Sequence, residues 1–311
     1  MMPSHSEGIV IQASSGLFQV ETADGVIECM ARAGADPGAI AAGDHVLISP
    51  QPAGRGVIES LMPRTTRFSR KVAGRRQDEQ VIAANLDQVV IVLAAAEPPF
   101  RETALDRYLA AAEHCDLNAV VCINKVDLVP APDPDSACDL ADRAEVYSRI
   151  GYMVIMTSAE TGSGIALLRQ TLEGRVSALV GPSGVGKSSL ICAVSPGVNL
   201  DVSEISSSTG KGRHTTTCSR LIKLDGGGYV ADTPGMREFG FHQISRDELA
   251  WCFREFRPHT KSCRFADCHH VKEPGCGVRE AVEQGLVSPG RYEHYLRLMG
   301  GVSQSNRLVV C

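Results

Sequence analysis

A glycine-rich octapeptide is the part of this chain whose residue types and spacing most clearly predict chemistry. It follows the apolar run 176–180, continues into Ser189, and reads Gly181-Pro182-Ser183-Gly184-Val185-Gly186-Lys187-Ser188. An apolar strand, a tight loop and a helix start form a P-loop, whose glycines let backbone N–H groups approach a phosphate. Lys187 would supply charge to the β- and γ-phosphates, and Ser188 a hydroxyl ligand for Mg²⁺. The segment therefore predicts a nucleoside triphosphate site.

Two short motifs predict that the base of this nucleotide is guanine. Asn124-Lys125-Val126-Asp127 follows the apolar run 119–123, and Ser158-Ala159 follows the strand expected at 153–156. Asp127 can accept hydrogen bonds from the ring N1–H and the exocyclic amine of guanine, a pair of donors that adenine lacks. Lys125 can cover the base, Asn124 can brace the loop, and the Ala159 N–H can donate to the guanine O6. ATP would leave the carboxylate unpaired, at a cost of about 1–3 kcal/mol.

Two segments after the P-loop supply candidates for contact with the γ-phosphate. The polar segment 206–217 contains Thr215 and Thr216, either of which can reach Mg²⁺, and we favour Thr216. In Asp232-Thr233-Pro234-Gly235, Asp232 would hold the metal through water and the Gly235 N–H would contact the γ-phosphate. Met236 stands where many GTPases carry the glutamine that orients the attacking water. Intrinsic hydrolysis should therefore be slow, by a factor of about 10³–10⁵, until a partner completes the site.

A cluster of cysteine and histidine near the C-terminus predicts a metal site. Cys263, Cys268 and Cys276, with either His269 or His270, supply the Cys₃His ligand set of a tetrahedral Zn²⁺ site. Four protein ligands leave no open position, so the metal would be structural. The surrounding helices expected at 246–256, 278–284 and 291–299 give a thin core, and metal loss should unfold this domain.

The expected secondary structure divides the 311 residues into three parts. Short strands at 9–12, 17–22, 26–32, 46–49 and 57–61 predict an N-terminal β-barrel, either an OB-fold or an SH3-like barrel. Strands at 88–95, 119–123, 153–156 and 176–180 alternate with helices, which predicts a central α/β domain whose ligands bind at the strand carboxyl ends. A hairpin over 221–231 completes it. The expected boundaries are 1–72 for the barrel with a basic linker, 73–240 for the nucleotide domain and 241–311 for a mainly α zinc domain.

Composition and charge are typical of a cytoplasmic globular protein. The chain is 43% hydrophobic and 22% charged, and none of its apolar runs is long enough to span a membrane. Eleven cysteines, mostly single, indicate a reducing compartment, and the first residues lack the layout of a secretion signal. The net charge of −5 argues against a nonspecific polyanion binder. The segment 64–76 carries six cations and no acid, which suits a solvated linker or an RNA-facing strip equally.

The order of the motifs resembles that of a circularly permuted GTPase. Ordinary small GTPases place the P-loop first, whereas here the guanine motifs precede it. With Gly-Arg-His-Thr-Thr-Thr at 212–217, Asp-Thr-Pro-Gly at 232–235, a barrel in front and a cysteine cluster behind, the chain resembles the RsgA (YjeQ) family from Gly8 to about Leu298. These are ribosome small-subunit-dependent GTPases that act late in small-subunit maturation.

The resemblance implies a function and a set of partners. It implies a monomeric GTPase that converts GTP to GDP, is stimulated by the small ribosomal subunit, and binds the rRNA of that subunit without a membrane. It also implies one structural Zn²⁺ on Cys263, Cys268, His270 and Cys276. The resemblance thus favours His270 over His269 as the histidine ligand. The permuted order further predicts that both switch segments lead directly into the last domain, so that loss of the γ-phosphate can reorient it.

Two other interpretations remain open at the level of sequence. One is a P-loop kinase or ATPase with no ribosomal link, for which ATP would displace labelled GDP as well as GTP does. The other is a zinc-containing RNA-binding adaptor whose nucleotide is only a structural ligand. In that case the rate of GTP turnover would not change when small subunits are added, and a Lys187→Ala variant would still bind the subunits.

Overall fold

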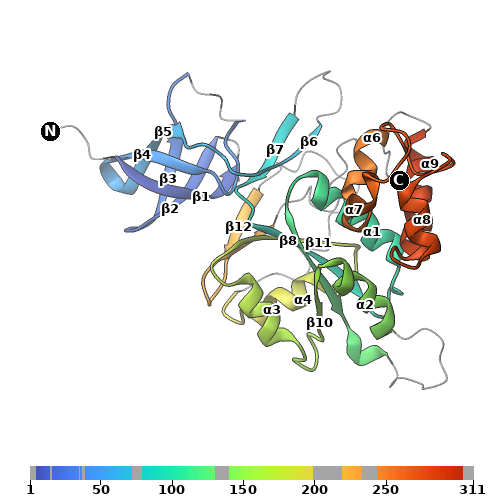
Figure 1. The fold of residues 1–311 in the computed structure, drawn as a ribbon. Helices are drawn as coiled ribbons and strands as arrows, with labels where there is room; N and C mark the ends of the chain where they lie inside the picture. Colours follow the sequence, from blue (N-terminus) through green and yellow to red (C-terminus); the bar gives the residue numbers. More distant parts are fainter. Residues whose placement is uncertain are drawn as a thin grey trace, which may run out of the picture.

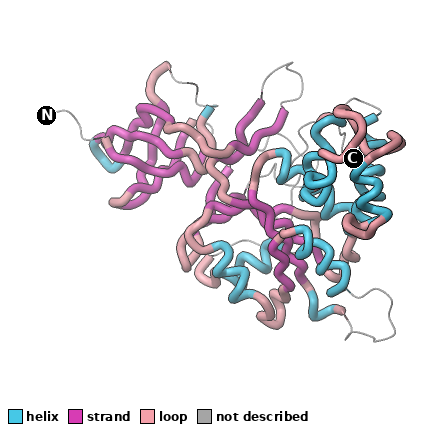
Figure 2. Tube along the Cα trace, viewed as in Figure 1, coloured by secondary structure: helices cyan, strands magenta, loops and turns pink. Residues whose placement is uncertain are grey.

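A computed structural model describes the chain as three parts that lie side by side, a barrel, an α/β domain and a small helical domain (Figures 1 and 2). The residues described are 5–14, 16–34, 36, 39–71, 79–129, 140–198, 219–232 and 244–303. None of the helices in these ranges is both long enough and apolar enough to cross a membrane.

The N-terminal part is a closed five-stranded barrel. Its strands are β1 (Ser6–Ser14), β2 (Leu17–Thr22), β3 (Gly25–Ala31), β4 (His45–Gln51) and β5 (Arg55–Leu61), with the 3₁₀ turn η2 (Pro52–Gly54) between the last two. They pair in the order β1-β2-β3-β5-β4, and β4 pairs again with β1. Alternate side chains such as Val10, Phe18 and Ile48 fill the interior. The structure therefore confirms the predicted OB-like barrel, and the parallel β3–β5 pair gives it the OB rather than the SH3-like topology.

A hairpin that the sequence did not predict follows the barrel. Strands β6 (Arg67–Lys71) and β7 (Glu79–Ala84) pair antiparallel, and β6 lies within the basic segment 64–76. The first cation of that segment has a structural role, because the Arg64 guanidinium donates to both carboxylate oxygens of the buried Asp44, at 2.6 and 2.7 Å. Arg64 therefore fastens the linker to the barrel and is not free to contact RNA.

The central part is a six-stranded sheet covered by helices on both faces (Figure 1). Its strand order is β10 (Met153–Met156), β9 (Asn118–Asn124), β8 (Gln88–Ala94), β11 (Val176–Val180), β13 (Tyr229–Asp232) and β12 (Ser219–Lys223), and only β12 runs antiparallel. The helices are α1 (Glu102–His114), α2 (Leu140–Ile150), α3 (Ile165–Leu172) and α4 (Lys187–Val194). Because side chains alternate along a strand, residues 89, 91 and 93 of β8 pack with α1, and residues 90, 92 and 94 with α3 and α4.

The barrel is attached to the edge of this sheet. Strand β1 pairs antiparallel with β12, where Gln12 lies opposite Arg220. On the barrel, Glu21 accepts a hydrogen bond of 2.7 Å from the Tyr229 hydroxyl and also pairs with Lys223. The two domains thus share one continuous sheet, which fixes the barrel relative to the α/β domain.

The C-terminal part consists of short helices around an aromatic core. They are α6 (Arg246–Leu249), η5 (Ala250–Cys252), η6 (Arg254–Phe256), α7 (Arg257–Thr260), α8 (Gly277–Glu283) and α9 (Pro289–Ser303). The single helix expected at 246–256 is broken, because Phe253 adopts an extended backbone with φ −101°. This break turns Phe253 inward, where its ring and that of Phe256 lie 5.3 and 5.0 Å from the Tyr295 ring.

Two carboxylates on α1 hold the C-terminal domain against the α/β domain. Asp106 is fully buried and accepts a hydrogen bond from Arg291 of α9, which is itself 3% exposed. Two turns further along α1, Glu113 accepts from Arg254 and from Arg257, at 2.5 and 2.6 Å. Buried charges of this kind are tolerated only when they are paired. The C-terminal domain is therefore held in the one position that pairs these carboxylates with its arginines.

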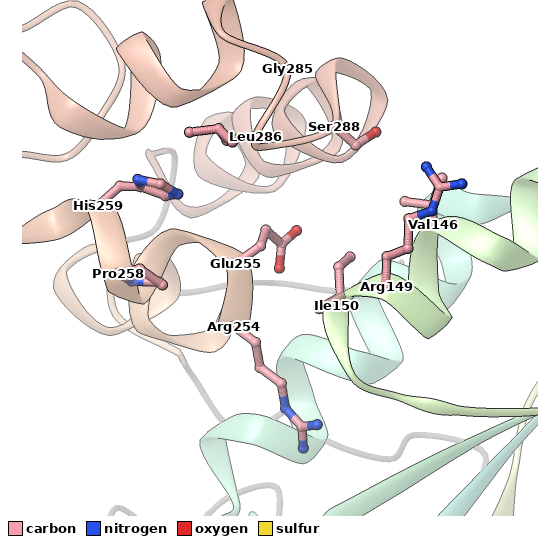
Figure 3. Close-up of a pocket in the computed structure, with 10 residues that line it drawn as sticks. All are labelled: Val146, Arg149, Ile150, Arg254, Glu255, Pro258, His259, Gly285, Leu286 and Ser288. Carbon is pink, nitrogen blue, oxygen red and sulfur yellow. The ribbon is translucent and has the colours of Figure 1, made fainter.

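A pocket of about 500 Å³ lies beside this interface, between α2 and the C-terminal domain (Figure 3). Its lining includes Arg149 and Ile150 of α2 together with Glu255, His259 and Leu286. It contains none of the residues that the sequence predicts for nucleotide or metal binding, so the candidate sites lie elsewhere.

Candidate functional site

The predicted nucleotide motifs lie at the carboxyl ends of neighbouring strands. The P-loop follows β11, the guanine motif ends β9 and enters the 3₁₀ turn η3 (Val126–Leu128), and Ser158 follows β10. These strands are parallel, with β8 between β9 and β11. Parallel strands end at one edge of the sheet, where ligands of doubly wound folds bind at the point at which the strand order reverses. Here the chain leaves β8 for β9 on one side and returns to β11 on the other.

Asn124 joins all three motifs through its buried side chain. Its Nδ2 donates to the carbonyl oxygen of Val185 in the P-loop, at 2.9 Å. Its Oδ1 accepts from the Thr157 hydroxyl at 3.2 Å and from the Ala159 N–H at 3.3 Å. Because the side chain is 1% exposed, these bonds are protected from competition by water. The loop expected to bind guanine and the loop expected to bind phosphate are therefore held at a fixed separation.

The P-loop has the backbone shape that its glycines predict. At Gly181, φ is 141° and a Cβ would lie 2.0 Å from the carbonyl oxygen of Val92. Lys187 begins α4 and its Nζ donates to the carbonyl oxygens of Gly181 and Pro182, at 2.8 and 2.7 Å. The ammonium group thus lies over the loop, where β- and γ-phosphates would be bound. Ser188 and Ser189 follow in the first turn of α4.

Gly186 provides a direct test of this geometry. It has φ 94°, and a Cβ at this position would lie 2.3 Å from Nδ2 of Asn124. We expect Gly186→Ala to displace Asn124 and to lower the affinity for GDP by about 100-fold or more, since strained backbone and a lost buried hydrogen bond each cost about 1–3 kcal/mol. Titration with a fluorescent GDP analogue measures this effect. Gly174→Ala is the matched control, because Gly174 also has positive φ but no atom would lie within 4 Å of its added Cβ.

The loop between β8 and α1 borders the site and was not predicted to belong to it. Lys125, in the left-handed conformation with φ 63°, donates from Nζ to the carbonyl oxygen of Glu97. Pro98 lies beside Gly184 of the P-loop, 3.9 Å from the position of an added Cβ. The hydrogen bond to Glu97 ties the end of the Lys125 side chain to this loop, while Asp127 is exposed in η3. The Glu-Pro-Pro sequence after β8 was the available signal for a fixed turn.

The residues predicted to contact the γ-phosphate are only partly covered by the structure. Asp232 is the last residue of β13, which pairs parallel with β11, so its backbone reaches the same edge of the sheet as the P-loop. Thr215, Thr216, Gly235 and Met236 lie outside the described residues.

The predicted metal ligands converge in the C-terminal domain. One ligand atom from each of Cys263, Cys268, His270 and Cys276 lies within 4.8 Å of the other three. The Nδ1 of His270 is 3.5 Å from Sγ of Cys263 and 3.3 Å from Sγ of Cys276. Tetrahedral Zn²⁺ with usual bond lengths would place such atoms about 3.6 Å apart, so this donor set fits the ion. His269 is not in the cluster, and its Nδ1 lies 3.8 Å from Asp247.

Glu273 supports the metal cluster, although its role was not predicted. Its carboxylate accepts from the backbone N–H groups of His269, Val271 and Lys272, at 3.2, 2.8 and 2.9 Å. Burial alone would raise its pKa, but these hydrogen bonds lower the pKa to about 2. The charged carboxylate therefore fixes the loop between His270 and Cys276. In the sequence, this role of Glu273 was indicated only by the Pro-Gly pair that follows it, which is typical of a turn.

Comparisons with known proteins show which family this chain is similar to. The model of the RsgA GTPase family matches residues 61–242. The chain is 45% identical over 305 residues to the small ribosomal subunit biogenesis GTPase RsgA of Gemmatimonas aurantiaca, covering 96% of this chain and 97% of that protein. The protein of the same name from Moorella thermoacetica is 42% identical over 303 residues, covering 97% and 99%.

Two solved structures share the whole fold. The crystal structure of YjeQ from Thermotoga maritima superimposes with a TM-score of 0.79 at 36% identity, covering 96% of this chain and 99% of that one. The structure of YloQ, described as a circularly permuted GTPase, gives a TM-score of 0.76 at 31% identity, covering 97% and 96%. The permuted order of motifs is therefore a property that the chain shares with YloQ.

Proposed function

The chain belongs to the RsgA family of GTPases, and on this premise we propose that it hydrolyses GTP to GDP as an assembly factor of the small ribosomal subunit. Membership of the family confirms the predicted resemblance and shows that the chain is a GTPase, which removes the interpretation as an unrelated kinase or ATPase. The observation that supports the proposal is the bonding of Asn124, which connects the loop proposed to bind guanine with the P-loop.

The residues of this site divide between the base and the phosphates. Asp127, Lys125 and the Ala159 N–H would bind guanine, the last by sharing or exchanging its 3.3 Å hydrogen bond to Asn124 for one to the guanine O6. Asn124, Val126 and Ser158 would shape the loops around the base. The backbone of 181–186 and the ammonium group of Lys187 would bind the phosphates, with Ser189 in the first turn of α4 beside them. Mg²⁺, held by Ser188 and Thr216, would neutralise charge on the β- and γ-phosphates.

The residues at the γ-phosphate favour hydrolysis that depends on a partner. Asp232 ends the strand next to the P-loop strand and would orient a metal-bound water, and the Gly235 N–H would contact the γ-phosphate. Met236 cannot orient water as a glutamine does, because a thioether accepts only weak hydrogen bonds and donates none. We propose that the small subunit supplies or positions the missing group.

We further propose that the Cys₃His cluster holds Zn²⁺ and that its role is structural. All four donors come from the protein, so four-coordinate Zn²⁺ would have no open position for a substrate, and Cys276 and His270 are almost completely buried. The proposed units are 1–72, 73–240 and 241–311. We propose that the chain acts as a monomer in the cytoplasm and contacts rRNA through the cations of the basic segment other than Arg64 and through the zinc domain.

GTP hydrolysis measured with and without purified small subunits tests the proposal. We expect release of phosphate to accelerate by about 10²-fold or more when equimolar subunits are present, as when a partner completes a GTPase site. Purified large subunits serve as the control and should give no acceleration. Equal rates in all three conditions would contradict the proposal and would favour an adaptor whose nucleotide is only structural.

A further inference from the structure

The outer face of β2 and β3 on the barrel differs from a surface that binds RNA. Along both strands every second side chain points outward, and the outward residues are Leu17, Gln19 and Glu21 on β2 and Val26, Glu28 and Met30 on β3. In OB-folds this face commonly binds oligonucleotides, using cations for the backbone and aromatic rings for the bases. Among these six outward residues there is no cation and no aromatic ring. Strands β2 and β3 therefore offer a nucleic acid neither of these contacts, and the neighbouring strand β5 adds an exposed cation, Arg55, which lies 3.8 Å from Glu28.

Acidic and basic side chains balance one another around this face. Glu28 lies 3.8 Å from Arg55 of β5, and Arg32 lies 3.4 Å from Glu59 of the same strand. Glu21 accepts from Tyr229 and pairs with Lys223 at the joint with the α/β domain. Affinity for a nucleic acid depends largely on cations that displace counterions from its phosphates. A charge-balanced surface with two outward carboxylates would therefore bind a nucleic acid weakly.

An exposed apolar row crosses three strands of the same face. Leu17 lies opposite Met30, and Met30 lies opposite Val57 of β5. Leu17 and Met30 are 48% and 59% exposed, although large apolar side chains favour burial. A hollow of about 280 Å³ adjoins the row and is lined by Leu17, Phe18, Gln19 and Glu28, among others. The barrel projects from the side of the α/β domain, so this face is open to a partner (Figure 1).

From these observations, and on the basis of the proposed function, we propose that the β2–β3–β5 face docks a protein of the small subunit rather than its RNA. The partner would place an apolar side chain against Leu17 and Met30 and into the hollow beside them. A basic side chain of the partner would lie next to Glu28, whose side chain is 55% exposed and lies 3.8 Å from Arg55. Methionine suits such a contact because its flexible, polarisable side chain adapts to the partner's shape.

A double variant, Leu17→Ser with Met30→Ser, separates the two kinds of partner. Both side chains point outward, so the barrel should fold, which circular dichroism and unchanged intrinsic GTP hydrolysis would verify. Binding is then measured to purified small subunits and, in parallel, to protein-free small-subunit rRNA. Val26→Ser is the matched control, because Val26 is 56% exposed on the same strand and face but lies opposite Glu21, away from the row.

We expect the double variant to bind small subunits about tenfold more weakly while its binding to protein-free rRNA is unchanged, and the control to behave as wild type in both assays. Equal weakening in both assays would assign the face to RNA and overturn the inference, and so would binding to subunits at the wild-type level. A wild-type protein that does not bind subunits would overturn the proposed function itself, and the inference with it.

Discussion

Lys187→Ala is expected to reduce GTP turnover by about 10³-fold, both with and without small subunits. The ammonium group lies 2.7–2.8 Å from two carbonyl oxygens of the P-loop. It would therefore place a positive charge of the protein beside the negative charge that develops on the β–γ bridge. Removal of one preorganised hydrogen-bond donor already lowers kcat by a factor of about 10²–10³, so loss of a full charge should lower it at least as much.

Release of phosphate from GTP under single-turnover conditions measures this loss. Lys261→Ala is the control for intrinsic hydrolysis, since Lys261 is exposed in the C-terminal domain, far from the P-loop in sequence and in fold. Turnover within about threefold of wild type in the Lys187 variant would show that the P-loop lysine is not part of the catalytic site.

Removal of the metal is expected to unfold the C-terminal domain while the barrel and the sheet persist. Structural Zn²⁺ contributes about 10–16 kcal/mol at pH 7 in small domains, which exceeds or equals the usual stability of a whole domain. Cys276 is 3% exposed and belongs to the same core as Phe253 and Tyr295, so loss of the ion would open that core. Hydrogen exchange after treatment with a strong chelator should lose protection across 244–303 only.

Single variants identify the ligands in the same experiment. Cys276→Ala and His270→Ala should lose bound metal and show the same loss of protection. His269→Ala should keep the metal, because His269 lies outside the cluster. Cys252→Ala, which removes a buried thiol of the same core that is not a ligand, should lower stability by only about 1 kcal/mol. A chelated protein with full protection over 244–303 would contradict a structural role for the metal.

Strands and loops with strong local signals could be predicted from the sequence. All five barrel strands were predicted within a few residues, because apolar alternation is bounded by turn residues at each end. The choice between the OB-fold and an SH3-like barrel was not available from the sequence, since it depends on the long-range pairing of β3 with β5. Strand β6 was missed because three of its five residues are cations, which hides the apolar pattern.

At the metal site, the spacing of the residues along the sequence was not sufficient to identify which histidine is the ligand. Adjacent histidines at 269 and 270 fit the same ligand pattern, and only the backbone separates them. His270 adopts φ 58°, which turns its ring toward the cysteines, while the carbonyl oxygen of His269 accepts a hydrogen bond from Tyr295 at 2.6 Å. A left-handed conformation at a residue other than glycine has no reliable sequence signal.

The docking of the C-terminal domain on α1 could not be predicted from the sequence either. Asp106 and Glu113 find their partners about 140 to 185 positions away, at Arg254 and Arg291, so no local pattern connects them. In contrast, the nucleotide motifs were found because each is local and each follows a strand. Their convergence required only the rule that parallel strands end at one edge of the sheet.

The nucleotide preference of Asp127→Asn tests most directly whether the guanine motif and the P-loop form one site. An asparagine loses one acceptor for guanine but can donate to the oxygen that xanthine carries in place of the amine. We predict that the wild-type protein binds GDP at least about 100-fold more tightly than ADP, and that the variant loses about 10²–10³ in GDP affinity and binds XDP instead. Equal affinity of the wild type for GDP and ADP, or a variant that binds GDP like wild type, would contradict the account.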